Sequence, residues 1–174
     1  MTLDEPISLV AYDPSWPALA AEQIGLLERA LAHHLVGCEH FGSTSVPGCE
    51  GKPIIDILIG LHTWPAALDV RKRLTDLGYE DLGEAGVPGR LYFRRRGPSS
   101  FNLAVTAHGG EIWRGNLAIR DLLRRDPTLV QAYVAEKRAA YGDGATTLLA
   151  YSKHKAAFMS QLAERAGNRL SPTP

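Results

Sequence analysis

The longest apolar run in the chain predicts a central, buried strand. Residues 54–61 read Ile-Ile-Asp-Ile-Leu-Ile-Gly-Leu, so an extended segment carries apolar side chains on both faces, and only Asp56 interrupts them. Strands that are apolar on both faces are typical of the covered interior of a sheet. Shorter runs predict further strands at 7–10, 38–41, 91–94 and 101–106, and the Gly97-Pro98 pair favours a hairpin between the last two.

Helical periodicity fills most of the remaining chain. Leucine and isoleucine recur at three- and four-residue spacing between residues 18 and 35, which predicts an amphipathic helix. A second helix is expected over 64–77, with Leu68 facing inward. The last third is helical throughout, with helices expected over 111–125, 128–141 and 146–166, and with a frayed tail over 167–174.

The order of these elements predicts an α+β fold. The strands fall in the first two thirds of the chain and the last third is helical, which suits a mixed β-sheet flanked by helices, with a C-terminal helical extension. We expect one domain over 1–174, with a sheet core at about 7–108 and a helical part at about 109–166. A chain of 174 residues can bury such a core without disulfides.

Composition restricts the class of partner and the compartment. Nineteen lysines and arginines balance nineteen aspartates and glutamates, so no overall charge favours nucleic acid or an anionic membrane. The chain has two cysteines, no signal-peptide pattern and no apolar run near the ~20 residues of a membrane helix. We therefore expect a cytoplasmic protein that acts on a small molecule or a nucleotide; the sequence specifies no oligomeric state.

A glycine-serine pair and a buried aspartate form the main candidate site. Gly42 and Ser43 directly follow the strand at 38–41, where glycine lets the backbone approach a phosphate and serine adds a hydroxyl donor. An aspartate on the neighbouring strand, Asp56, is then placed to hold Mg²⁺ (or Mn²⁺) against that phosphate. A small-residue turn beside a structural aspartate fits the same pattern without a ligand, so both interpretations stay open.

The surroundings of Asp56 sharpen this hypothesis. A buried carboxylate is costly unless it is paired, hydrogen-bonded or bound to metal, and Lys52 is a candidate partner four residues upstream. Chemistry with two metal ions usually needs a second carboxylate two residues along the strand. Leu58 occupies that position, so the two-metal pattern is absent.

Basic and aromatic residues on the predicted helices are further candidates. Arg120 interrupts an apolar helical stretch and suits a phosphate. Two tyrosine–lysine pairs with i,i+4 spacing either line a cleft or cover core with the lysine stems; they are Tyr133 with Lys137 and Tyr151 with Lys155. His40 is retained because it lies two residues before Gly42, whereas the Arg94-Arg95-Arg96 run is interpreted as solvated surface.

Four segments resemble the GrpB family, which is placed with DNA polymerase beta in the nucleotidyltransferase-like superfamily. They are Tyr12-Asp13-Pro14-x-Trp16-Pro17, His40-Phe41-Gly42-Ser43-Thr44-Ser45-Val46-Pro47-Gly48, Lys52-Pro53-Ile54-Ile55-Asp56-Ile57, and Arg120-Asp121-x-Leu123-Arg124 followed by Pro127. The resemblance spans roughly residues 7–166. It implies a nucleotidyltransferase-like fold and transfer of a nucleotidyl group from a nucleoside triphosphate to a small-molecule acceptor.

The resemblance also implies roles for the candidate residues. The segment Gly42, Ser43, Thr44 and Ser45 would hold the triphosphate, Asp56 would hold the metal, and Lys52 and Arg120 would balance charge. The acceptor would lie near Tyr133, Lys137, Tyr151 and Lys155.

One departure from the family pattern affects this expectation. The family typically has His-Leu-His where this chain has Asn102-Leu103-Ala104. Asn102 can still hydrogen-bond or coordinate weakly, but Ala104 can do neither. Two alternatives to transfer therefore stay open: a non-catalytic module that binds a nucleotide or another anionic small molecule, and a repurposed enzyme that uses the same pocket.

Overall fold

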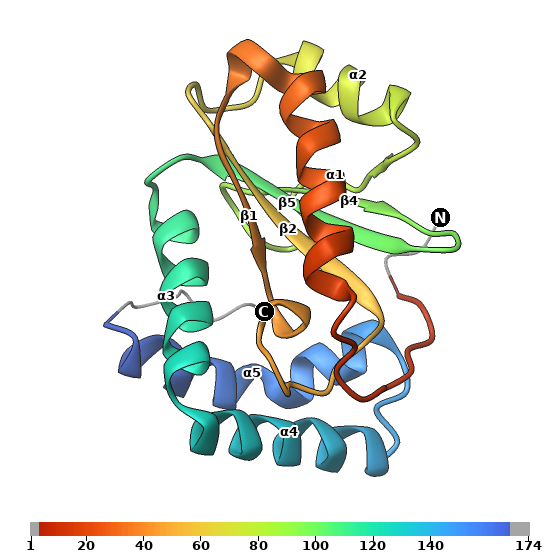
Figure 1. Cartoon of the computed structure of the whole chain (residues 1–174), viewed down its shortest axis with the longest axis vertical. Coiled ribbons are helices and arrows are strands. Elements are labelled where there is room, and N and C mark those ends of the chain that lie inside the picture. Colours follow the sequence, from red (N-terminus) through yellow and green to blue (C-terminus); the bar gives the residue numbers. More distant parts are fainter. Residues whose placement is uncertain (1–3, 168–174) are drawn as a thin grey trace.

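A mixed five-stranded sheet forms the centre of the molecule (Figure 1). The computed structural model describes residues 4–167. The strands β1 (Leu35–Phe41), β2 (Ile54–Leu61), β3 (Glu80–Asp81), β4 (Leu91–Arg95) and β5 (Ser100–Ala107) lie in the order β1-β2-β5-β4-β3. Only β2 and β5 run parallel to each other; every other neighbouring pair is antiparallel. The expected α+β class is confirmed.

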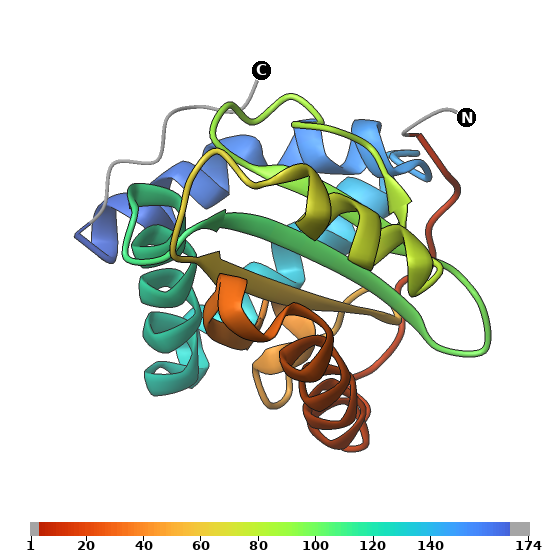
Figure 2. The same cartoon turned by 90° about the horizontal axis from the view of Figure 1, so that it is seen from above.

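Helices cover both sides of the sheet. The helices α1 (Trp16–Leu31) and α2 (Leu68–Asp76) precede the hairpin, and α3 (Glu111–Arg125), α4 (Pro127–Gly142) and α5 (Leu148–Arg165) follow it. The pair α4 and α5 packs together at the end of the sheet away from α2 (Figure 1), and α1 and α5 lie on opposite sides of the central strands (Figure 2). None of the helices within residues 4–167 is long and apolar enough to cross a membrane.

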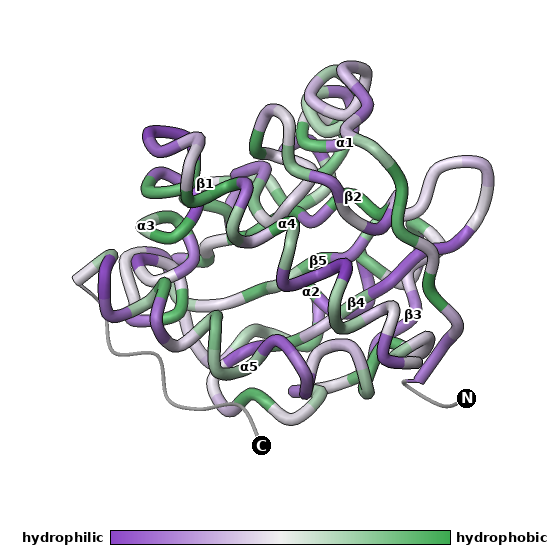
Figure 3. Tube along the Cα trace, turned by 90° about the horizontal axis from the view of Figure 1, so that it is seen from below, coloured by the Kyte–Doolittle hydropathy of each residue, from purple (hydrophilic) through white to green (hydrophobic). Residues whose placement is uncertain are grey.

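Alternation along β2 assigns its side chains to the two faces. Ile55, Ile57 and Ile59 belong to the main core, which α1 and α2 complete. Asp56 and Leu58 must then point to the opposite face, because successive side chains of a strand alternate. Hydrophobic residues follow the central strands, and the helices alternate hydrophobic and polar segments (Figure 3). The candidate site therefore lies on the face of the sheet that α3, α4 and α5 approach.

Several elements differ in the structure from those expected from the sequence. The expected strand at 7–10 forms only isolated bridges, from Pro6 to Thr147 and from Val10 to Gly51, because its partners lie far away along the chain. The helix expected from residue 64 begins at Leu68, whose place in the first helical turn leaves it 83% exposed instead of inward. The two-residue strand β3 was not anticipated, and most of the expected tail lies outside the described residues.

Candidate functional site

Asp56 lies at the centre of the candidate site. It is the third residue of β2 and pairs in register with Asn102 on the parallel strand β5. The Asn102 amide donates a hydrogen bond of 2.7 Å to Asp56 Oδ1, and Arg96 Nη2 donates one of 2.9 Å to Asn102 Oδ1. These bonds fix the Asp56 carboxylate on the sheet.

The turn after β1 touches Asp56 directly. Gly42 has φ 70° and ψ −171°, a backbone region that only glycine occupies readily. A Cβ atom at Gly42 would lie 2.6 Å from Asp56 Oδ2. Residues Ser43–Ser45 then form a single 3₁₀ turn instead of the start of an α-helix. The closeness of Gly42 to Asp56 brings the predicted phosphate-binding turn and the predicted metal ligand together.

The hydroxyl groups of Thr44 and Ser45 are engaged within the protein. Thr44 Oγ1 lies 2.9 Å from His40 Nε2, and Ser45 Oγ donates to the Gly42 carbonyl at 2.7 Å. Burial, together with the charges of Arg124 and Arg120, lowers the pKa of His40 to about 4, so the imidazole is neutral at physiological pH. The hydroxyls of Thr44 and Ser45 therefore stabilise the turn.

Two half-buried lysines face Asp56. Burial lowers the pKa of both Lys52 and Lys155 to about 8, although the negative charge of Asp56 partly opposes that shift. Burial likewise raises the pKa of Asp56, against the charges of the two lysines and the hydrogen bond from Asn102. Neither lysine forms a direct ion pair with Asp56 in the part of the chain that the structure describes. The charge of Lys155 also lowers the pKa of Lys52, so the two ammonium groups lie near each other and near the Asp56 carboxylate.

The two predicted tyrosine–lysine pairs have different environments. Lys137 is 1% exposed, and its ammonium donates to Ser43 Oγ and Cys49 Sγ, both at 3.1 Å, and to the Glu50 carbonyl. These bonds attach α4 to the turn. The ammonium of Lys155, by contrast, lies 4.1 Å from the centre of the Tyr151 ring and 5.6 Å from that of Tyr133. Lys155 is therefore the better placed of the two lysines to meet a ligand.

Arg120 binds other protein groups. Its guanidinium donates to Glu39 Oε2 at 2.7 Å, to Asp121 Oδ1 at 2.8 Å and to the His40 carbonyl at 3.1 Å. Arg124 similarly donates to the Ser45 carbonyl at 2.9 Å. These bonds anchor the turn to α3, so the proposed contact of Arg120 with a phosphate stays a prediction.

An apolar cluster occupies the positions where further carboxylates would be needed. Leu58 and Ala104 lie side by side on β2 and β5 and pack with Trp113 from α3. The Trp113 ring covers Gly37 and Gly60, where an added Cβ would lie 3.0 Å and 2.8 Å from ring atoms. This face of the sheet is filled with side chains immediately beyond Asp56.

The residues present do not fit a pair of metal ions. Two-metal sites hold both ions with several carboxylates, yet residues 4–167 contain no group of three or more histidine, cysteine or acidic residues able to hold a metal. The Asn102 oxygen already accepts a bond from Arg96. A single Mg²⁺ that arrives with a triphosphate needs only one or two protein carboxylates, and Asp56 can supply one.

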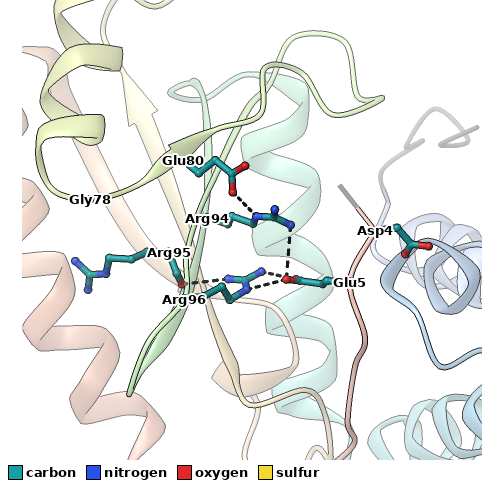
Figure 4. Close-up of a pocket in the computed structure, with 7 residues that line it drawn as sticks. All are labelled: Asp4, Glu5, Gly78, Glu80, Arg94, Arg95 and Arg96. Atoms are coloured by element: carbon teal, nitrogen blue, oxygen red, sulfur yellow. Dashed lines mark hydrogen bonds and ion pairs between the residues drawn. The ribbon is translucent and has the colours of Figure 1, made fainter. Parts of the chain in front are cut away.

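A charged hollow of about 450 Å³ adjoins this site (Figure 4). Its lining includes Glu5, Glu80, Arg94 and Arg96. The arginine run was expected to be solvated surface, but Arg96 bonds to Asn102 and so contributes to the setting of Asp56. In the sequence, the spacing of Arg94 and Arg96 was the one indication that the two arginines lie on the same side, since alternate residues of an extended segment point the same way.

Comparisons with known proteins agree with the resemblance. The family model described as GrpB protein matches residues 6–165. A UPF0157 protein of Deinococcus radiodurans is 31% identical over 167 residues, which cover 93% of this chain and 84% of that protein. The UPF0157 protein YqkA of Bacillus subtilis is 28% identical over 133 residues, which cover 76% of this chain but only 39% of that longer relative.

A solved structure has the same architecture. The crystal structure of the conserved protein GrpB from Enterococcus faecalis superposes with a TM-score of 0.83 at 27% identity, covering 91% of this chain and 96% of that one. The family model matches nearly the same span as the resemblance found in the sequence, which covers roughly residues 7–166. The chain belongs to the GrpB family.

Proposed function

We propose that this GrpB chain binds a phosphorylated small molecule beside Asp56, with a nucleoside triphosphate as the first candidate. The observation that carries the proposal is the pair Lys52 and Lys155. Both are half-buried, burial lowers the pKa of each to about 8, and Asp56 is the carboxylate that they share. An anionic ligand would supply the missing negative charge.

The geometry of the neighbouring groups supports the same ligand class. Gly42 has no side chain, so its backbone lies directly against the Asp56 carboxylate, and a phosphate bound by the turn would lie beside that carboxylate. The rings of Tyr133 and Tyr151 lie beneath the Lys155 ammonium and are themselves buried, so they hold that ammonium in place beside the site. Phosphate oxygens beside the turn and near the lysines would satisfy both features.

A single Mg²⁺ or Mn²⁺ fits this proposal as a companion of the ligand. Asp56 would be its protein carboxylate, and the phosphates and water would complete the shell of oxygens. The positive charge of the metal would also favour the ionised form of Asp56, whose pKa burial raises.

Nucleotidyl transfer to a small acceptor is the second candidate. The position of Asp56 beside the Gly42–Ser43 turn favours it, as the family resemblance implies. The apolar cluster of Leu58, Ala104 and Trp113 disfavours it, because it replaces the further metal ligands that such transfer usually needs. Binding without transfer is therefore the simpler function for this geometry.

A thermal-shift screen tests the proposal. The purified protein is heated with each nucleoside triphosphate, with and without Mg²⁺ or Mn²⁺, and binding at about 100 times Kd should add about 2.7 kcal/mol of stability. Lys155→Met should abolish the shift, whereas Lys72→Met should not, since Lys72 pairs with Asp76 on the exposed surface of α2. A shift that is absent for every triphosphate, or equal in both variants, contradicts the proposal.

Two further measurements test whether binding depends on the metal and whether a bound triphosphate is turned over. Asp56→Asn should remove the part of the shift that depends on metal and keep the part that depends on the lysines. Release of pyrophosphate from a bound triphosphate in the presence of candidate acceptors would favour the second candidate, and binding without release would favour the first.

A further inference from the structure

The Glu5 side chain is bound as a ligand would be bound. Arg96 donates two hydrogen bonds to the Glu5 carboxylate, one of 2.6 Å from Nη2 to Oε1 and one of 3.1 Å from Nε to Oε2. Arg94 Nη1 lies 3.6 Å from the same Oε2. A planar fork of this kind is the geometry by which arginine recognises carboxylates.

Of the three neighbouring arginines, Arg94 and Arg96 contact the Glu5 carboxylate and Arg95 does not. In Figure 4, Arg94 and Arg96 point toward Glu5, while Arg95 points the other way, toward α1. Arg95 donates to Gln23 Oε1 at 2.7 Å and lies over the rings of Tyr79 and Phe101. The fork at Arg94 and Arg96 is thus distinct from the structural contacts of the middle arginine.

Hydrogen bonds connect Arg96 to the candidate site. Arg96 donates to Asn102, which donates to Asp56. The hollow beside it has a volume of about 450 Å³, which lies in the range of small-molecule pockets. A ligand group seated between Arg94 and Arg96 would lie in a continuous path of hydrogen bonds to Asp56.

The charges of the hollow balance only while Glu5 faces it. Two carboxylates, those of Glu5 and Glu80, pair there with the two guanidinium groups of Arg94 and Arg96. Removal of one carboxylate leaves one positive charge in excess. A hollow with that charge favours an anion.

The Glu5 side chain can leave the arginines without releasing its segment. The backbone carbonyl of Glu5 accepts from Leu148 N at 2.8 Å, and Ile7 N donates to Thr146 O at 2.9 Å. Leu149 N also donates to Asp4 Oδ1 at 2.9 Å, which attaches the same segment to the start of α5. The segment is held by its backbone, and the carboxylate is a separate contact.

We propose that the hollow between Arg94 and Arg96 is a subsite for the carboxylate of a small organic acid, and that Glu5 occupies it as an internal substitute. A ligand carboxylate displaces the Glu5 side chain, accepts the same two bonds from Arg96, and leaves the N-terminal segment in place. The subsite needs no nucleotide, so its test is independent of the function proposed above.

Malonate provides the probe, with inorganic phosphate as the comparison. Binding to the whole chain is followed by amide chemical shifts in NMR titrations. Glu5→Gln should raise the affinity for malonate by about tenfold or more, because the competing charged hydrogen bonds are lost. The largest shifts are expected at the amides of Arg96 and Asn102.

Matched variants separate competition from a general change of charge. Asp81→Asn removes the same charge from the next residue after Glu80, but Asp81 pairs with Arg71, outside the hollow, so the affinity should stay within about twofold. Arg96→Gln added to Glu5→Gln should cancel the gain.

Three results would overturn the subsite. They are an unchanged affinity for malonate in folded Glu5→Gln protein, a gain that survives Arg96→Gln, and a gain for phosphate that exceeds the gain for malonate. Cooperative thermal unfolding verifies the fold of each variant. If Glu5→Gln does not fold, Glu5→Asp carries the same test, since its shorter side chain withdraws the carboxylate from Arg96.

Discussion

Replacing Gly42 with alanine tests the contact on which the candidate site is built. The substitution has two costs. Alanine at φ 70° and ψ −171° is strained, which costs about 1–3 kcal/mol. Its Cβ would also lie 2.6 Å from Asp56 Oδ2, so the carboxylate must move. Moving it breaks the hydrogen bond from Asn102, and a bond to a charged group is worth about 1.5–3 kcal/mol.

The variant Gly48→Ala measures the backbone strain without the contact to Asp56. It has φ 75°, and an added Cβ would meet nothing within 4 Å, so Gly48→Ala should incur only the strain of about 1–3 kcal/mol. Urea unfolding gives the free energy of unfolding of each variant. Gly42→Ala should be the more destabilising of the two by about 1.5–3 kcal/mol, the value of the broken hydrogen bond.

A double-mutant cycle assigns that difference to Asp56. In an Asp56→Ala background the carboxylate is gone, and most of the difference between Gly42→Ala and Gly48→Ala should disappear with it. Equal costs of the two glycine substitutions in the unchanged chain would refute the reasoning. So would a difference that persists without Asp56, because the strain at Gly42 would then explain it alone.

Three further predictions concern the surroundings of the site. Trp113→Ala should lower the free energy of unfolding in urea by about 3–5 kcal/mol, because the ring fills the face over Gly37 and Gly60; a loss near zero would contradict that packing. Lys137→Met should cost about 1–3 kcal/mol in the same assay by leaving its acceptors unpaired, whereas exposed Lys153→Met should stay within about 0.5 kcal/mol. Affinity for a triphosphate should fall as the pH rises through about 8, where Lys52 and Lys155 lose their protons. Below that pH both lysines are charged already. Near it, binding should take up protons, which calorimetry in two buffers of different ionisation enthalpy would detect; binding without proton uptake would contradict the assignment.

Local pattern was sufficient to predict most of the fold. The apolar run at 54–61 identified the central strand, and the spacing of leucines identified the helices, because burial on one or two faces imposes those periods. Prediction from the local pattern was wrong where a segment pairs with residues far away in the sequence. Pro6 and Val10, at the two ends of the expected strand, form bridges to Thr147 and Gly51, and β3 is too short at two residues to show any period.

The candidate site was partly predictable for the same reason. Gly42 directly follows β1 and Asp56 lies on the adjacent strand β2, so their positions in the sequence indicated their contact. The role of Arg96 depends on Asn102 and on Glu5, which is 91 residues away, and no local signal reports that meeting. Lys137 and Lys155 share one sequence pattern but differ in structure, because the rotation of α4 and α5 against the sheet is set by tertiary packing.

The apolar cluster behind Asp56 has a consequence for any redesign of the site. A carboxylate introduced at Leu58 alone would be an unpaired charge at a position with no solvent exposure, beneath Trp113. Such a buried charge would destabilise the fold before it could bind any metal. A centre with several carboxylates on this face would need Leu58, Ala104 and Trp113 to change together. A redesign by single substitutions is therefore confined to the immediate surroundings of Asp56.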